Sequence, residues 1–289
     1  MTDAPPSTPT PAAAVHAPDR RSARADDGIT LLWQEEGSGP PVLLLQGQAT
    51  PAAGWDRVAA DLATEFRVLR GEQRGVGGSG PVAGTNRPVD PASDAEDRWT
   101  TRALAQDVRA VLDAAGVDRV QVVGHSMGGK IAQWLAVDHP ERVASLTLLA
   151  TSAGTADGVP RDEAAHRLLI GRDAEARTAL FFDAGWVAAH ADEVRTFFTL
   201  DAPRRVLRGL YRASTEHDTV AVLPRITAPT LVVHGGRDRL AAPDSARRLA
   251  AGIPGARLVL LPDAGHGLHL DSPEAATAVR DFLREHAGR

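Results

Sequence analysis

The chain contains no cysteine among its 289 residues, which excludes disulfides, thiolate metal sites and a cysteine nucleophile. No stretch approaches ~18 consecutive apolar residues, so the sequence predicts no membrane-spanning helix. Lysine occurs once, at Lys130, and arginine therefore carries almost all of the positive charge. Because the net charge of −5 comes from interspersed acids and bases, we expect neither a nucleic acid nor a membrane as a partner.

The length and the apolar fraction of 43% suffice for one large α/β domain with an insertion, or for two small domains. The first 26 residues stand apart, because they are rich in proline, alanine, serine and threonine. They lack the basic start and the apolar core of a secretory signal. We predict that residues 1–26 form a disordered tail and that the protein is cytoplasmic.

Beyond this tail, short apolar runs alternate with longer amphipathic segments, a pattern typical of a mostly parallel sheet covered by helices on both faces. The predicted strands are residues 29–34, 41–45, 66–70, 120–123, 145–149, 230–234 and 257–261. The predicted helices include residues 55–64, 101–115, 130–139, 243–251 and 273–286. We therefore predict an α/β core formed by residues 27–152 and 224–289.

Residues 153–223 interrupt the alternation, because they show helical patterns and no convincing strand. Four of the six phenylalanines of the chain lie in this segment. Its aromatic side chains form either a small core of their own or the wall of an apolar pocket. We predict a helical cap over the site, with five candidate pocket residues: Phe181, Phe182, Trp186, Phe197 and Phe198.

Residues 124–129, which read Gly-His-Ser-Met-Gly-Gly, are the most informative stretch. A β-branched run precedes them and a helical pattern follows, which is the context in which a Gly-x-Ser-x-Gly turn has chemical meaning. Such a turn lifts the serine hydroxyl above the sheet and directs backbone N–H groups toward it. Ser126 is therefore the candidate nucleophile, and the alternative is an ordinary glycine-rich turn.

A serine hydroxyl needs a base to take its proton and an acid to orient that base. Asp238 follows the predicted strand 230–234, and His266 follows the predicted strand 257–261. Loops at the carboxyl ends of parallel strands share one edge of the sheet, where ligands collect. The chain order of serine, acid and histidine also fits the motif, so we predict that Asp238 orients His266 toward Ser126.

Two neighbours compete for these roles. Asp263 lies three residues before His266, and His269 lies three residues after it. We favour a turn role for Asp263 and a scaffold or pocket-rim role for His269. We expect His125 to pack beneath the serine turn. No set of histidine, aspartate and glutamate has convincing metal spacing, so we predict no metal site.

With these motifs the chain resembles the α/β-hydrolase fold family, in its branch of small esterases, lactonases and cofactor-free perhydrolases. The resemblance runs from about Asp27 to the C-terminus. It implies a catalytic triad of Ser126, Asp238 and His266, and no cofactor. The stretches that carry it are residues 124–129, Gly236-Arg237-Asp238, Gly265-His266, and residues 74–79, which are similar to the family's Arg-Gly-x-Gly-x-Ser loop.

The resemblance also implies an oxyanion hole built from two backbone N–H groups, those of Met127 and Gln48. The family usually has His-Gly-x directly after the strand predicted here for residues 41–45, where this chain has Gln46-Gly47-Gln48. The backbone donor survives this change, whereas the internal hydrogen bonding of the loop and the polarity beside the substrate are altered by it. The Gln48 side chain either points into the pocket or faces solvent.

We predict a serine hydrolase that cleaves an ester or lactone of a small-to-medium hydrophobic substrate through an acyl-enzyme. The same triad is compatible with a carbon–carbon bond hydrolase or a cofactor-free perhydrolase. The fold is also compatible with a non-hydrolytic binding protein or a biosynthetic catalyst. Epoxide hydrolases and haloalkane dehalogenases of this fold use an aspartate nucleophile, and Ser126 argues against both. The expected partner is a small molecule, and the oligomeric state stays open.

Overall fold

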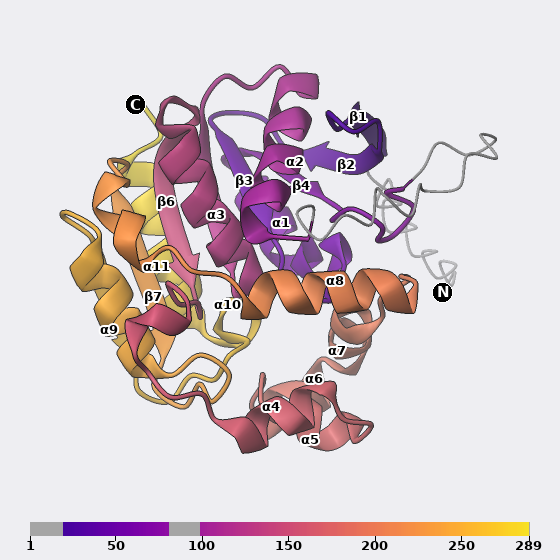
Figure 1. The fold of residues 1–289 in the computed structure, drawn as a ribbon, viewed down its shortest axis with the longest axis vertical. Coiled ribbons are helices and arrows are strands. Elements are labelled where there is room, and N and C mark those ends of the chain that lie inside the picture. Colours follow the sequence, from indigo (N-terminus) through magenta and orange to yellow (C-terminus); the bar gives the residue numbers. More distant parts are fainter. Residues whose placement is uncertain (1–19, 81–98, 289) are drawn as a thin grey trace, which may run out of the picture.

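The computed structural model describes residues 20–80 and 99–288, in which eight strands form one sheet with helices on both faces (Figure 1). The strands lie side by side in the order β1-β2-β4-β3-β5-β6-β7-β8. The first two strands in this order are antiparallel to their neighbours, and all later pairs are parallel. The strands are β1 (Arg21–Arg24), β2 (Thr30–Glu36), β3 (Pro41–Leu45), β4 (Arg67–Gly71), β5 (Val120–His125), β6 (Val143–Leu149), β7 (Thr230–Gly235) and β8 (Arg257–Leu261). The predicted α/β class is confirmed.

Eleven α-helices lie in the described part of the chain, and none of them is both long and apolar enough to cross a membrane. Short 3-10 helices cover Ala52–Trp55, Pro140–Arg142, Thr155–Asp157 and Val220–Arg225. The α-helices are α1 (Asp56–Leu62), α2 (Thr101–Ala114), α3 (Met127–Asp138), α4 (Glu163–Ile170), α5 (Ala174–Thr178), α6 (Ala184–Ala189), α7 (Ala191–Phe198), α8 (Arg204–Thr215), α9 (Pro243–Gly252), α10 (Leu268–Asp271) and α11 (Pro273–Glu285).

The sheet separates two hydrophobic cores. Helices α2, α3 and α9 pack on one face, and α1 and α11 pack on the other. Along β3, Leu43 and Leu45 point into the first core, whereas Val42 and Leu44 point into the second. A strand buried on both faces has no polar alternation, which is why β3 reads as a continuous apolar run with the observed bounds.

The predicted tail over residues 1–26 is wrong at its C-terminal end, because β1 occupies Arg21–Arg24. This strand pairs antiparallel with β2 at the edge of the sheet, and Ala23 is buried against the core. The composition of the segment suggested disorder, but β1 is held by a partner strand that local composition does not reveal. The first 19 residues of the predicted tail lie outside the described residues.

Helix α3 starts at Met127, three residues before the predicted start. Glycine is a poor helix former, which explains why the predicted helix begins too far along the chain. A Cβ atom on Gly128 would lie 2.1 Å from the carbonyl oxygen of Leu45, and one on Gly129 would lie 2.7 Å from Thr151. The two glycines are therefore set by close packing of the first helical turn rather than by helix propensity.

The segment between β6 and β7 contains α4 to α8 and no strand of the sheet, only an isolated bridge between Gly154 and Asp218. In Figure 1, α8 crosses one end of the sheet and α4 to α7 lie beyond it. This helical insertion has a hydrophobic core of its own, in which Phe181, Phe182 and Phe197 pack against Leu270 of α10.

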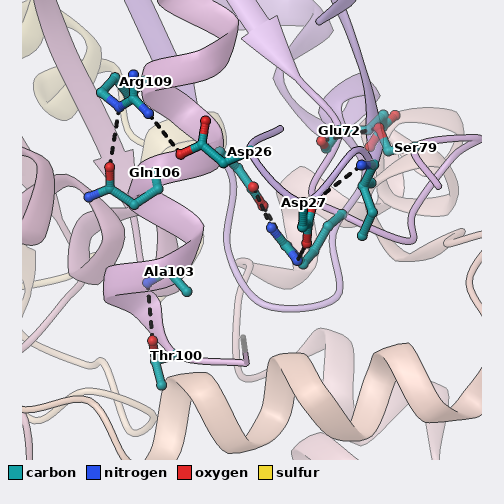
Figure 2. Close-up of polar contacts among 11 residues, drawn as sticks. Asp26, Asp27, Glu72, Ser79, Thr100, Ala103, Gln106 and Arg109 are labelled. Carbon is teal, nitrogen blue, oxygen red and sulfur yellow. Dashed lines mark hydrogen bonds and ion pairs between the residues drawn. The ribbon is translucent and has the colours of Figure 1, made fainter. Parts of the chain in front are cut away.

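A buried ionic cluster fastens the loop after β4 to α2. The guanidinium of Arg74 donates to both carboxylate oxygens of Asp107, at 2.6 and 2.5 Å, and to Asp27 at 2.9 Å. All three side chains are 10% exposed or less. Figure 2 shows the neighbouring pair, in which Asp26 reaches Arg109 of α2 at 3.0 Å. The family-like loop at residues 74–79 is thus anchored by charge.

We expect Arg74→Met to lower the free energy of unfolding by about 3–5 kcal/mol, because it leaves buried carboxylates without their guanidinium. Urea denaturation measures this loss. Arg102→Met is the matched control, since the Arg102 side chain is 58% exposed and pairs with Asp138. The control should cost at most about 1 kcal/mol. Equal losses in the two variants would contradict a structural role for the cluster.

Candidate active site

Ser126 lies in a strained turn between β5 and α3. Its backbone has φ 53° and ψ −117°, a conformation that non-glycine residues rarely adopt. The Ser126 N–H donates to the Leu149 carbonyl at 2.9 Å, and Thr151 Oγ1 donates to the Ser126 carbonyl at 2.7 Å. A Cβ on Gly124 would lie 2.6 Å from the Gly128 carbonyl oxygen. Glycine at the start of the turn therefore lets the strand and helix approach closely enough to raise Ser126 above the sheet.

The structure brings the three predicted triad residues together. His266 Nε2 lies 3.0 Å from Ser126 Oγ, and His266 Nδ1 lies 2.7 Å from Asp238 Oδ2. Asp238 follows β7 and His266 follows β8, so both come from loops at the same edge of the sheet. With the carboxylate accepting at Nδ1, the Nε2 lone pair of His266 faces the serine hydroxyl.

The environment of Asp238 favours its carboxylate form. Burial by itself would raise the pKa of Asp238, but the charge and hydrogen bond of His266 lower the pKa below its usual value. The other carboxylate oxygen accepts from the backbone N–H groups of Leu240 and Ala241, at 2.8 and 2.9 Å. Asp238 is therefore ionised at neutral pH and can stabilise a positive charge on the imidazole of His266.

Neither rival residue joins this arrangement. The Asp263 side chain is 85% exposed and pairs with Arg237. His269 is buried, and its ring lies 4.1 Å from the ring of His125 and 4.6 Å from that of Trp55. His125 packs beneath the turn, as expected, and its Nε2 donates to the His266 carbonyl at 2.9 Å.

The loop proposed to supply an oxyanion donor is held by hydrogen bonds from the side chains of Gln46 and Thr50. Gln46 Nε2 donates to the Gly71 carbonyl at 2.8 Å, and Thr50 Oγ1 donates to the Gly47 carbonyl at 3.0 Å. Gln48 is half-buried and lines the same pocket as Ser126. Met127 is the first residue of α3, so its N–H has no acceptor within the helix. The N–H of Met127, one of the two candidate donors, is therefore free of helical hydrogen bonding.

A pocket of about 80 Å³ opens at Ser126 and His266. Of the five aromatic residues predicted to line it, Phe181 does so. The prediction is wrong for the other four. Phe182 and Phe197 are buried in the core of the insertion, half-buried Phe198 packs against them, and Trp186 lines a separate cavity of about 540 Å³. Their rings pack against one another and against the aliphatic side chains of the insertion, which keeps them out of the pocket at Ser126.

Polar side chains line much of the pocket instead, and no sequence motif predicts them. The basic ones are Lys130, Arg161 and His166. A weak signal existed for Lys130, which lies one helical turn after Ser126 and hence on the same side of α3. The described residues contain no group of three or more metal-ligating side chains that could hold a metal ion. The other polar residues of the lining include Gln48, Thr50, Thr151, Ser152, Ser214 and Thr215.

The chain belongs to the alpha/beta hydrolase fold family, whose model matches residues 40–273. It is similar to a Variovorax paradoxus protein named "Putative carbamate hydrolase RutD", with 35% identity over 85% of this chain and 91% of the relative. A solved hydrolase from Pseudomonas aeruginosa PA01 is 30% identical with a TM-score of 0.73, covering 92% of this chain and 98% of that one. The enol-lactonase from Burkholderia xenovorans LB400 is 28% identical with a TM-score of 0.74, covering 91% and 100%.

Buried imidazoles predict a loss of stability in acid. Burial lowers the pKa of His125 to about 3 and likewise lowers the pKa values of His217, His234 and His269. Below about pH 6.5 the unfolded chain binds protons that the folded chain does not, so stability falls as pH falls. Each group contributes up to about 1.4 kcal/mol per pH unit.

We therefore expect a lower urea midpoint at pH 5.0 than at pH 7.0. His217→Gln should reduce this difference in midpoint, because it removes one of the buried imidazoles. His217 suits the test because it is not a triad residue and hydrogen-bonds Thr101 at 2.7 Å. A midpoint that is equal or higher at pH 5.0 would contradict the prediction.

Proposed function

We propose that the protein is a serine hydrolase that cleaves an ester or lactone through an acyl-enzyme. The observation that carries this proposal is the chain of contacts from Ser126 Oγ through His266 to Asp238, at 3.0 and 2.7 Å. The strained backbone of Ser126 supports it as well, since such strain is typical of a nucleophile turn. Carbamates and enol-lactones, named for the relatives, share a carbonyl carbon open to attack.

In the proposed reaction, His266 Nε2 takes the proton of Ser126 while the serine oxygen attacks the carbonyl carbon. Asp238 stabilises the imidazolium that forms. The negative charge on the carbonyl oxygen is received by the N–H groups of Met127 and Gln48. The alcohol leaves with the proton from His266, and water then repeats the sequence on the acyl-enzyme, which releases the acid and restores the serine.

The preference for hydrophobic substrates expected from the sequence is not part of this proposal. It depended on an aromatic pocket wall, and four of the five aromatic residues lie elsewhere. Carbon–carbon bond hydrolysis and perhydrolysis use the same triad, and no contact in the pocket favours either. Labelling of Ser126 by a fluorophosphonate would exclude a pure binding role, because the reagent requires an activated serine.

Ser126→Ala should lower kcat on 4-nitrophenyl esters or lactones by about 10⁴ to 10⁶, because the covalent pathway is lost. His266→Ala should cost a similar amount, and the double variant little more, since the two residues act as a unit. Circular dichroism should show an intact fold in each case. If His269→Ala abolished turnover while His266→Ala did not, the base would be misassigned.

Asp238→Asn should lower kcat by roughly 10⁴, because an amide no longer holds His266 in the required tautomer. Asp263→Asn is the matched control, with the same chemical change at an exposed carboxylate. It should leave kcat within about threefold of the original, as expected for a surface substitution. The opposite ranking in matched kinetics would transfer the acid role to Asp263.

A further inference from the structure

Basic side chains from separate parts of the chain meet at the pocket of Ser126. Lys130 lies on α3, Arg161 precedes α4, and His166 lies within α4. All three line the pocket together with Ser126 and His266. Lys130 and Arg161 also line an adjoining pocket of about 90 Å³. The fold therefore places positive charge directly beside the proposed nucleophile.

Lys130 and Arg161 have no carboxylate in contact with them among residues 20–80 and 99–288. Lys130 Nζ donates to the Ser214 carbonyl at 2.8 Å, with Ser214 Oγ at 3.4 Å. An ammonium group has three N–H bonds, so this contact leaves donors free for a ligand. Arg161 Nη1 lies 3.5 Å from His166 Nε2, which itself hydrogen-bonds the Tyr211 hydroxyl at 2.7 Å.

The carboxylates nearby are engaged with other groups or lie beyond contact. Asp162 pairs with Arg239 at 2.8 Å and accepts from the Ala165 N–H at the start of α4. Asp157 is buried and accepts from the Val159 N–H. Its charge acts on Lys130 only from beyond ion-pair distance. Burial prevails over that charge and, with Arg161, lowers the pKa of Lys130 to about 8. Lys130 is thus a poorly solvated cation that an anion in the pocket would stabilise.

We propose that Lys130, assisted by Arg161, binds a carboxylate on the acyl part of the substrate, so that the enzyme prefers anionic esters or lactones to neutral ones. This inference rests on the proposed reaction at Ser126. Because His266 protonates the leaving alcohol, the proposal places the acyl part on the side of Ser126 away from His266, toward Lys130 in the same pocket. Side chains four residues apart on a helix have Cβ atoms about 5–6 Å apart, which fits an acyl chain of roughly six carbons in total, counting both the attacked carbonyl and the carboxylate.

The test compares mono(4-nitrophenyl) adipate with its neutral methyl ester, a pair that differs only by the carboxylate charge. The original protein should hydrolyse the anionic ester with a kcat/KM at least about tenfold higher, as expected for a charge-assisted hydrogen bond. Lys130→Met should remove most of this ratio, and Arg161→Met should reduce it about threefold, because Arg161 is exposed.

Arg208→Met is the matched control. It removes one positive charge from α8 at an exposed position outside both pockets, and the ratio should stay unchanged. An equal kcat/KM for the two esters in the original protein would overturn the inference while leaving the proposed function intact. The same holds for a ratio that Lys130→Met does not change, which would mean that Lys130 only caps the end of α8.

A binding measurement separates the inference from the proposed reaction. Calorimetry with adipate and the Ser126→Ala variant should show binding that the added Lys130→Met substitution weakens at least about tenfold. Adipate binding without Ser126-dependent hydrolysis of either ester would overturn the proposed function and support the anion site. Absence of adipate binding would overturn the anion site, whatever the hydrolysis result.

Discussion

The close approach of α3 to the end of β3 is the constraint on which the rest of the site depends. A Cβ on Gly128 would lie 2.1 Å from the Leu45 carbonyl oxygen, so only glycine allows α3 to begin this close to the end of β3. This contact fixes the distance between the serine turn and the loop that starts at Gln46. It also leaves Ser126 in a strained conformation, with φ at 53°. The strain persists because the packing of the strand before the turn and the helix after it holds the backbone in this conformation.

Parallel strand pairing extends this local constraint to the whole site. Residues of β5, β6, β7 and β8 pair in register, so their carboxyl ends meet at one edge. That arrangement brings loops separated by more than a hundred residues within hydrogen-bond distance of one another. His125 completes the assembly from below, since its Nε2 holds the backbone carbonyl of His266. His266 is thus held at its ring by Asp238 and at its backbone by His125.

The sequence predicted the parts of the molecule that obey local rules. Continuous apolar runs predict strands buried on both faces, such as β3. The order of the serine, acid and histidine motifs predicts the triad loops at the strand ends. Features that depend on distant partners were missed. Strand β1 requires pairing with β2, and the early start of α3 requires the contact between Gly128 and Leu45. The basic pocket lining was missed for the same reason, because Lys130 and Arg161 converge only in the folded chain.

Except for Phe181, which lines the pocket, the aromatic residues of the insertion affect the site by supporting the loop of His266 rather than by lining the pocket. The Gly267 N–H donates to the Phe181 carbonyl at 2.8 Å, which ties the insertion to the loop of His266. A Cβ on Gly267 would lie 2.2 Å from the Phe182 ring, so this loop and the aromatic core are in close contact. The ring of Phe181 lies 5.1 Å from the ring of His266. The aromatic core therefore supports the loop that carries His266, while polar side chains of the insertion line the pocket at Ser126.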